Sequence, residues 1–242
     1  VGNGSNLLVG DLGYHGAVIS IGKAFGEIRV EDNRIFAGAG ALLASVARNA
    51  LTAELTGFEF AAGIPGSVGG AVVMNAGAYG SEMKDVMASA MVLTPEGEVV
   101  TIASEDLELG YRTSCVLKKG YVVLGAEFVL EHGDPEKIRE QMDELAGKRR
   151  EKQPLEYPSA GSTFKRPQGD FAGRLIEVAG LRGFRVGDAQ VSEKHCGFVI
   201  NRGEASSADI LNLCRQVQER VKENSGVELE LEVKLLGEFS VK

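Results

Sequence analysis

The chain has 242 residues, of which 44% are hydrophobic, and its formal net charge is −8. This length allows one large or two modest domains with a real core, and the negative charge argues against a general nucleic-acid-binding protein. No basic segment leads into an apolar one, as in a secretory signal, and the three cysteines form no CxxC pair. Because the three histidines are scattered, no metal site is indicated. We expect a cytoplasmic protein without disulfides and without nucleic-acid or membrane partners.

The first half of the chain predicts short strands and turns around one helix. It opens on a Gly-Asn-Gly turn without an initiator Met, so we expect that the native N-terminal segment is missing. Residues 41–55 predict a helix with Leu42, Val46 and Leu51 on one face. Strands are expected at residues 16–21, 27–30, 88–93, 99–102 and 121–130.

The second half predicts an α+β arrangement. Asp134 is placed to cap a helix that starts at Pro135, and Pro154 ends the helical pairing. We assign residues 1–133 to a first domain and residues 134–242, from this helix onward, to a second. Two further helices are expected at residues 170–179 and 207–225, each ended by a glycine.

The last predicted strand, residues 227–235, alternates strictly between apolar and charged side chains. Its apolar face consists of Val227, Leu229, Leu231, Val233 and Leu235. Its other face carries Glu228, Glu230 and Glu232, followed by Lys234. From this pattern alone, Glu232 is a solvated surface residue, and nothing in the spacing distinguishes it from the other two glutamates.

The most informative segment is residues 63–80, GIPGSVGGAVVMNAGAYG, which holds six glycines. Glycine leaves main-chain N–H groups bare, so they can point at an anion such as a pyrophosphate. The run from Phe60 to Ser81 has no charged residue and is long enough to cross a bilayer. Its glycines, proline and asparagine make a poor lipid-facing helix, so we reject a membrane span. Tight turns of a β-domain explain the composition equally well.

The opening residues, Gly2-Asn3-Gly4-Ser5-Asn6-Leu7, only superficially match a dinucleotide fingerprint. Leu7 stands in place of a glycine, and no acidic residue ends a following strand at the right distance, so a Rossmann domain is not expected. The amides of this turn are suited to phosphate oxygens, although an ordinary Asx or Ser/Thr turn at a strand end is the simpler interpretation.

Two other segments contain candidate chemical groups. If Arg112 of YRTS is buried, its guanidinium can clamp a carboxylate with two parallel hydrogen bonds, although a solvated arginine is commoner. The loop 159–167, SAGSTFKRP, combines small residues and hydroxyls with two cations, which suits anion binding or proton transfer. Because no His or Asp partner is nearby, a hydrolase triad is not supported, and a capped loop between domains is the alternative.

Taken together in order, seven segments make the chain resemble the UDP-N-acetylenolpyruvoylglucosamine reductase family over essentially its whole length. They are VGNGSNLLVGD, the residues from Glu59 to Gly80, YRTS, KQPLEYPSAGSTFKRP, FAGRLIEVAGLRG, VSEKHCGFVIN and LELEVKLLGEF. No long insertion separates YRTS from the SAGSTF loop, so the resemblance is to the shorter form of the family. It implies a vanillyl-alcohol-oxidase-type FAD-binding domain followed by an α+β substrate-binding domain. The implied activity is NADPH-dependent reduction of a UDP-sugar enolpyruvyl ether, and we expect a monomer.

The resemblance also implies roles for individual residues. Ser162 matches the proton donor, and Arg112 and Glu232 match the two groups that steady the reacting enolpyruvate. The UDP-sugar is expected to contact Lys152, Lys165 and Arg166, the last at a position where many members carry Asn. FAD is expected to lie between the two glycine-containing segments, at Gly2, Asn3, Gly4, Ser5, Asn6, Gly63, Ile64, Pro65, Gly66, Ser67, Gly69, Gly70, Asn75, Gly77, Ala78 and Tyr79.

Two other functions remain as alternatives. An oxidase of the same flavin fold would act on alcohols or sugars, and many such enzymes attach the flavin through His or Cys, neither of which occurs in the glycine-containing segments. A non-catalytic fragment is the other alternative, because the family carries further flavin-contacting sequence before GNGSN. Such a fragment would be colourless and would take up no FAD.

Overall fold

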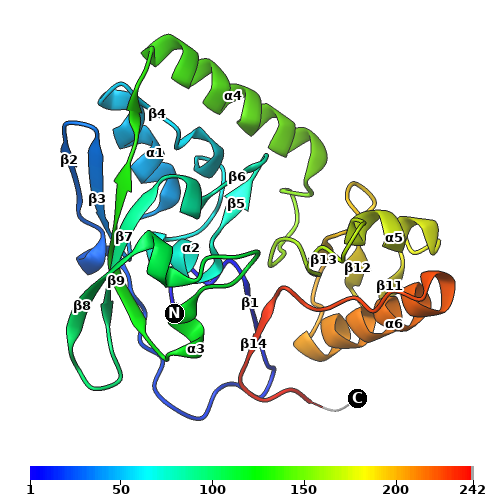
Figure 1. Ribbon diagram of the computed structural model, residues 1–242. Helices are drawn as coiled ribbons and strands as arrows, with labels where there is room; N and C mark the ends of the chain where they lie inside the picture. The colour runs from blue at the N-terminus through cyan, green and yellow to red at the C-terminus, as the bar shows by residue number, and fades with distance from the viewer. Residues whose placement is uncertain (241–242) are drawn as a thin grey trace. The chain divides into compact units, whose positions relative to one another are not determined.

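The computed structural model describes residues 1–240, and the chain folds into two compact units (Figure 1). Residues 1–4 and 18–149 form the first unit, and residues 5–17 together with the chain from residue 150 onward form the second. This division differs from the expected ranges 1–133 and 134–242, because the helix starting at Pro135 falls mainly in the first unit and residues 5–17 join the second. Within the described chain, every helix is too short or too polar to span a membrane.

The first unit contains a five-stranded antiparallel sheet with the strand order β2-β3-β9-β7-β8. Its strands are β2 (Ile28–Glu31), β3 (Arg34–Gly38), β7 (Met87–Leu93), β8 (Val99–Ala103) and β9 (Val122–Val129). The four predicted strands in these regions are confirmed. The strand predicted at 16–21 is wrong, because Val18 and Ile19 are exposed and no neighbouring strand pairs with this segment in the described chain.

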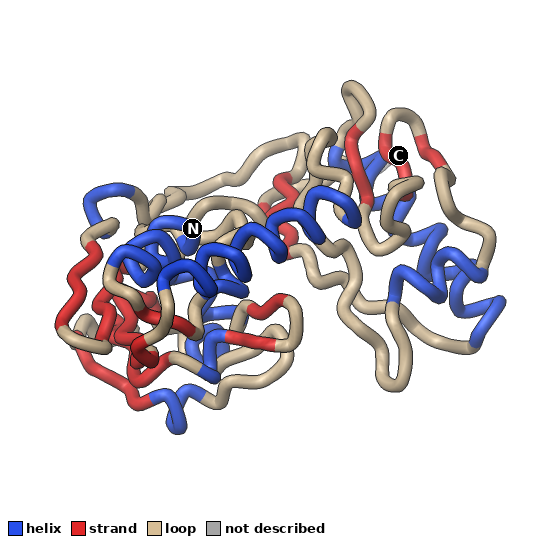
Figure 2. The backbone as a smooth tube through the Cα atoms, turned by 90° about the horizontal axis from the view of Figure 1, so that it is seen from above, coloured by secondary structure: helices blue, strands red, loops and turns tan. Residues whose placement is uncertain are grey.

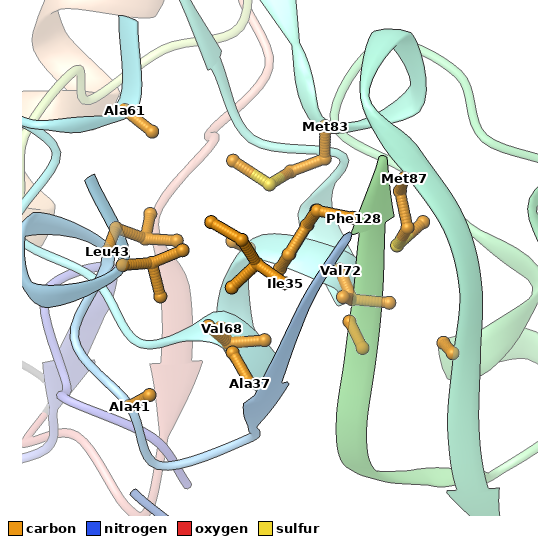
Figure 3. Packing of buried hydrophobic residues seen from close by; sticks show 14 of the residues in the cluster. Ile35, Ala37, Ala41, Leu43, Ala61, Val68, Val72, Met83, Met87 and Phe128 are labelled. Atoms are coloured by element: carbon orange, nitrogen blue, oxygen red, sulfur yellow. The ribbon is translucent and has the colours of Figure 1, made fainter. Parts of the chain in front are cut away.

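One face of this sheet is buried and the other is exposed to solvent, as is common for antiparallel sheets. In the buried core, Ile35 of β3 lies directly opposite Phe128 of β9, and neither side chain is accessible to solvent (Figure 3). On the other face, the Arg29 guanidinium lies 4.7 Å from the centre of the Phe36 ring. Helices α1 (Leu43–Thr52) and α2 (Val68–Met74) contribute to the core.

Helix α1 confirms the predicted helix but corrects its buried face. Leu42 is the N-cap residue and is 46% exposed, because it precedes the first helical turn. The helical residues that face the core are Leu43, Val46, Ala47 and Ala50. The predicted helix at Pro135 is also confirmed as α4 (Pro135–Lys152), with the Asp134 carboxylate accepting the Glu136 N–H at 2.9 Å.

Short elements complete the first unit (Figure 2). They are strands β4 (Leu55–Thr56), β5 (Gly77–Ala78), β6 (Ser81–Glu82) and β10 (Glu131–His132), helix α3 (Cys115–Lys118), and 3₁₀ turns at Lys23–Phe25, Glu59–Ala61, Met83–Asp85 and Ser104–Leu107.

The second unit has its own core around two helices and a three-stranded antiparallel sheet. These elements are α5 (Ala172–Val178), α6 (Ser207–Ser225), β11 (Arg185–Val186), β12 (Ala189–Val191) and β13 (Val199–Asn201). Both predicted helices are confirmed. Separately, β1 (Leu7–Val9) pairs in parallel with β14 (Lys234–Leu236).

The strand predicted over residues 227–235 is largely wrong. Only Lys234 and Leu235 of that range lie in a strand, β14, while Leu231 makes a single bridge to Phe164. Along the described chain, the alternating sequence has no long neighbouring strand to pair with, so no continuous ladder forms. The regular in-and-out pattern of the side chains therefore breaks just before β14.

The first turn of α6 is closed by hydrogen bonds from its own unit. Ser206 Oγ accepts the Asp209 N–H at 3.1 Å, and the Asp209 carboxylate accepts the Ser206 N–H at 3.1 Å. The Asp11 carboxylate accepts the next two amides, from Ser207 at 2.8 Å and Ala208 at 3.0 Å. These bonds satisfy donors that a helix leaves unpaired, and they connect residues 5–17 to the rest of the second unit.

We expect Asp11→Ala to lower the free energy of unfolding by about 1 kcal/mol at neutral pH, as for loss of a helix cap. The hydrogen bond from the Ser207 amide lowers the pKa of the Asp11 carboxyl below its ordinary value. This stabilisation is therefore complete above the unfolded-state pKa of about 3.9 and is lost as the pH falls through the lower folded-state pKa.

Urea unfolding of both proteins as a function of pH measures this effect. Asp143→Ala, which removes an exposed carboxylate from α4, controls for the loss of a charge. A stability difference between wild type and Asp11→Ala that does not shrink in acid would contradict the capping role.

Candidate active site

The glycine-rich segment folds into a loop, helix α2 and the β5–β6 hairpin. Part of its glycine content has a purely local reason. A Cβ atom on Gly77 would lie 2.6 Å from the Ser81 carbonyl oxygen, and one on Gly69 would lie 3.0 Å from the Ala39 Cβ. These glycines allow close packing of the backbone, so the segment is partly the set of tight turns that composition also suggested.

Ser67 marks the part of this segment that fits an oxygen-rich ligand. Ser67 is only 3% exposed, and its Oγ has no hydrogen-bond partner among residues 1–240. A Cβ on Gly2 would lie 2.4 Å from this oxygen, so only glycine leaves the hydroxyl open, and Asn3 Nδ2 donates to the Pro65 carbonyl at 2.8 Å. Because buried hydroxyls are almost always paired, this one is open to an oxygen-rich ligand such as a phosphate group.

Asn75 connects the glycine-rich segment to the loop that carries Arg112. Its side chain is fully buried, and its amide nitrogen donates to Glu82 Oε2 at 3.0 Å and to the Gly110 carbonyl at 3.2 Å. Its amide oxygen accepts the Lys84 N–H at 2.9 Å. The side chain of Asn75 is thus used within the protein, where it fixes the Gly110 loop.

Arg112 is half-buried and has a left-handed backbone conformation, with φ of 54°. Such a conformation is strained for a residue other than glycine, and strain of this kind gathers at functional sites. Its guanidinium lies 5.0 Å from the centre of the Tyr111 ring, and its Nη2 is 3.5 Å from the Gly77 carbonyl oxygen. The structure therefore brings Arg112 to the β5–β6 hairpin of the same unit.

Arg149 is a candidate site residue that no sequence motif singled out. Its side chain is half-buried at the end of α4, where a Cβ on Gly63 would lie 3.2 Å from its Cδ. Burial lowers the pKa of the guanidinium, and no carboxylate within the described chain pairs with it. A signal was present in the helical spacing, because Arg149 follows Met142 and Leu145 by seven and four residues on the side of α4 that faces the unit.

Tyr79 lies beside Arg149. It also has a left-handed backbone, with φ of 56°, and its hydroxyl donates to the Leu145 carbonyl at 3.3 Å. Tyr79 as a whole is 46% exposed. Arg149 of α4 thus lies beside Tyr79 of the glycine-rich segment, which itself has no charged residue.

In the second unit, backbone hydrogen bonds of Thr163 connect the segment that carries Ser162 to the segment that carries Glu232. The Thr163 carbonyl accepts the Glu232 N–H at 2.9 Å, and the Thr163 N–H donates to the Gly197 carbonyl at 2.9 Å. Thr163 Oγ1 also accepts the Val199 N–H at 2.9 Å. Ser162 itself forms a bridge with Phe198 and is exposed, so a rigid backbone presents its hydroxyl to solvent.

Glu232 differs from the two glutamates before it. Glu228 pairs with Lys222 at 2.5 Å and Glu230 pairs with Lys165 at 2.8 Å, all on the surface. Glu232 is only 8% exposed. The prediction from alternation that Glu232 is solvated is therefore wrong, because the strand pattern breaks between Leu231 and β14 and turns this side chain inward.

The three predicted cations of the substrate site lie at or near the surface of the second unit. Lys165 is partly exposed and forms its ion pair with Glu230, and the Arg166 guanidinium lies 4.7 Å from the centre of the Phe171 ring. Lys152 is exposed at the end of α4. Surface ion pairs contribute little stability, so this pairing does not prevent Lys165 from binding an anion.

The predicted phosphate-binding turn, residues 2–6, is divided by the structure. Gly2, Asn3 and Gly4 belong to the first unit, whereas Ser5 and Asn6 belong to the second. Asn6 Nδ2 donates to the Glu232 carbonyl at 3.2 Å. Nothing in the local sequence predicts this contact, because 226 positions separate the two partners.

Comparison with known proteins first defines the class of protein. Residues 1–103 match a family model described as "FAD binding domain", which agrees with the open Ser67 hydroxyl and the bare backbone around it. The match to an FAD binding domain thus defines the chain as a flavoprotein. Residues 153–236 match the model described as "UDP-N-acetylenolpyruvoylglucosamine reductase, C-terminal domain".

Relatives over nearly the full chain define the particular family. A UDP-N-acetylenolpyruvoylglucosamine reductase of Agathobacter rectalis is 61% identical over 99% of this chain and 80% of its own length. One from Clostridium novyi is 55% identical, over 99% and 78%. The crystal structure of such a reductase from Thermus caldophilus superimposes with a TM-score of 0.86 at 40% identity, over 98% of this chain and 84% of that chain. The chain belongs to the UDP-N-acetylenolpyruvoylglucosamine reductase family.

Proposed function

We propose that this protein reduces the enolpyruvyl ether of UDP-N-acetylglucosamine-enolpyruvate to UDP-N-acetylmuramate, with NADPH as the reductant, in peptidoglycan synthesis. The family membership supports this activity. The observation that carries the mechanism is the backbone pairing that joins the segment of the exposed Ser162 to the segment of the buried Glu232 through Thr163. A hydroxyl held by a rigid backbone suits proton transfer to a reacting carbon.

FAD, when bound, supplies hydride chemistry to the β-carbon of the enol ether. The residues of this chain have the remaining tasks. Negative charge then develops on the substrate carboxylate, and the Arg112 guanidinium stabilises it with two parallel hydrogen bonds. The strained backbone of Arg112 fixes the direction in which this side chain leaves the loop.

Ser162 donates the proton to the α-carbon. Serine is a weak acid, so it can act only on a strongly basic carbon, such as the one formed when the substrate carboxylate takes up charge. Glu232, which is only 8% exposed, assists by hydrogen bonding to the reacting group. Bridges at Ser162 and at Phe164 hold this stretch of backbone, so the hydroxyl is positioned before the substrate arrives.

The first unit holds FAD through Gly2, Asn3, Ser67 and the backbone from Gly63 to Gly66. Arg149 adds the positive charge that the glycine-rich segment lacks. The UDP-sugar carries two phosphates and is bound through Lys152, Lys165 and Arg166. A protein with a net charge of −8 needs such local cations to bind anionic ligands.

Arg149→Met is expected to weaken FAD binding by about 10- to 100-fold, the usual range for losing a hydrogen bond to a charged group. Calorimetric titration of the apoprotein with FAD measures the change. Arg150→Met is the matched control, because the Arg150 side chain is exposed one residue further along α4. Wild-type FAD affinity in Arg149→Met would remove this residue from the site.

A direct test of the proposed function combines a spectrum with a turnover assay. The protein is expected to show flavin absorbance between about 350 and 500 nm, or to gain it after adding FAD, and to oxidise NADPH only when the enolpyruvyl substrate is present. Oxygen consumption with simple alcohols or sugars, and no reaction with the enolpyruvyl ether, would favour an oxidase. A protein that takes up no FAD would be a non-catalytic fragment. We also propose that the protein is cytoplasmic and monomeric. Light scattering after size-exclusion chromatography measures its mass in solution and so tests the oligomeric state.

A further inference from the structure

We infer that Asn6 is a positioning residue for Glu232, rather than only a part of a cofactor-binding turn. This inference rests on the proposed function, because it takes Glu232 to act on the substrate. Its basis is the hydrogen bond of 3.2 Å from Asn6 Nδ2 to the main-chain carbonyl oxygen of Glu232. Both residues belong to the second unit.

The Glu232 backbone is held at two points. Its N–H donates to the Thr163 carbonyl at 2.9 Å, and its carbonyl accepts the Asn6 amide. The Lys234 N–H in turn donates to the Asn6 carbonyl at 2.9 Å, where β1 starts to pair with β14. Asn6 thus contacts the chain on both sides of Val233.

This support is needed because Glu232 lies between two regions of regular pairing. The single bridge from Phe164 to Leu231 ends before it, and β14 begins only at Lys234. Without the Asn6 amide, the peptide group after Glu232 loses its side-chain donor and can rotate. A shift of about 1 Å in a catalytic group, caused by a change outside the reacting centre, can lower a rate by about 100-fold.

A purely structural role for Asn6 is the competing explanation, and the chain offers a matched control. Asn33 makes the same kind of bond in the first unit, from its Nδ2 to the Leu130 carbonyl at 3.1 Å, and is also half-buried. Asn33→Ala therefore removes an equivalent side-chain-to-backbone bond away from Glu232. Both alanine variants are expected to lower the melting temperature by similar amounts.

The test uses the FAD-loaded protein and separates the two halves of the catalytic cycle. Stopped-flow absorbance measures flavin reduction by NADPH, and then flavin reoxidation by the enolpyruvyl substrate without oxygen. Asn6→Ala is expected to slow reoxidation by about 10- to 100-fold, with flavin reduction, FAD affinity and substrate KM within about threefold of wild type. Asn33→Ala is expected to change none of these.

A double-mutant cycle links the effect to Glu232. In a Glu232→Gln background, adding Asn6→Ala is expected to slow reoxidation by less than about threefold further, because the group that it positions is already disabled. If Asn6→Ala folds poorly, Asn6→Asp takes its place in the test. Its side chain has the same shape without the donor, so it is expected to slow flavin reoxidation by a similar factor.

Each of four results would overturn the inference. Equal slowing by Asn6→Ala in both backgrounds would mean that it acts independently of Glu232. Weaker FAD binding with normal reoxidation of the loaded enzyme would make Asn6 a cofactor ligand instead. Normal flavin reoxidation in Asn6→Ala, together with slow reoxidation in Glu232→Gln, would contradict the positioning role and leave the proposed function intact. Normal reoxidation in Glu232→Gln itself would instead remove the catalytic role of Glu232 on which the inference rests.

Discussion

Replacing Ser162 by alanine is expected to slow reduction of the enolpyruvyl substrate by about 10²- to 10⁴-fold, the range for losing a general acid. FAD binding and flavin reduction by NADPH should stay at wild-type levels, because the hydroxyl is needed only for proton delivery to the α-carbon. The fold should be unaffected, since the bridge of residue 162 to Phe198 is made by main-chain atoms and the side chain is exposed.

Stopped-flow measurement of both half-reactions separates these effects. Ser159→Ala, an exposed serine in the same loop, controls for the loss of a hydroxyl. Ser162→Cys keeps a donor and should recover part of the lost rate. Reoxidation of the flavin at the wild-type rate in Ser162→Ala would show that another group delivers the proton.

Replacing Arg112 by glycine is expected to reduce kcat/KM by about 10²- to 10³-fold, the usual effect of removing a group that stabilises developing charge. Its effect on stability should be small. Arg112 has φ of 54°, a conformation that glycine adopts without strain. The relief of strain and the greater freedom of glycine in the unfolded chain roughly cancel, so the free energy of unfolding should stay within about 1 kcal/mol of wild type.

The combination of normal stability with lost activity distinguishes a functional arginine from a structural one. Asp32→Gly is the matched control, because Asp32 has φ of 52° in an exposed hairpin turn of the same unit. Urea unfolding and steady-state kinetics of both variants make the comparison. A wild-type kcat/KM for Arg112→Gly, or a large loss of stability, would contradict the role of Arg112 in binding the substrate carboxylate.

Helices were the most predictable elements because their end signals act locally. Gly226 ends α6 as expected, and Asp134 with Pro135 starts α4. Strands needed neighbours that the local sequence does not reveal. Residues 16–21 and 227–233 have strand-like composition, yet no adjacent strand among residues 1–240 offers a continuous ladder. Alternation predicts a strand only where a partner exists.

Site residues that belong to a family motif could be predicted from the sequence. Site residues whose position depends on tertiary packing could not. Ser162, Arg112 and Glu232 came from family segments, whereas pattern alone placed Glu232 on the surface. Its burial follows from the break in pairing before β14, which depends on Phe164 and Asn6. The Asn6 contact arises from tertiary packing, so no local rule could select it, and helical spacing indicates only the side of α4 on which Arg149 lies.

The most direct test is a single turnover of the FAD-loaded, NADPH-reduced protein mixed without oxygen with UDP-N-acetylglucosamine-enolpyruvate in D₂O. Our account predicts that the oxidised flavin spectrum returns and that the product, UDP-N-acetylmuramate, carries solvent deuterium at the α-carbon. The same experiment with Ser162→Ala should leave the flavin reduced over the time in which the wild type is fully reoxidised. The account would be contradicted if the wild-type protein binds FAD but its reduced flavin is not reoxidised in the presence of this substrate.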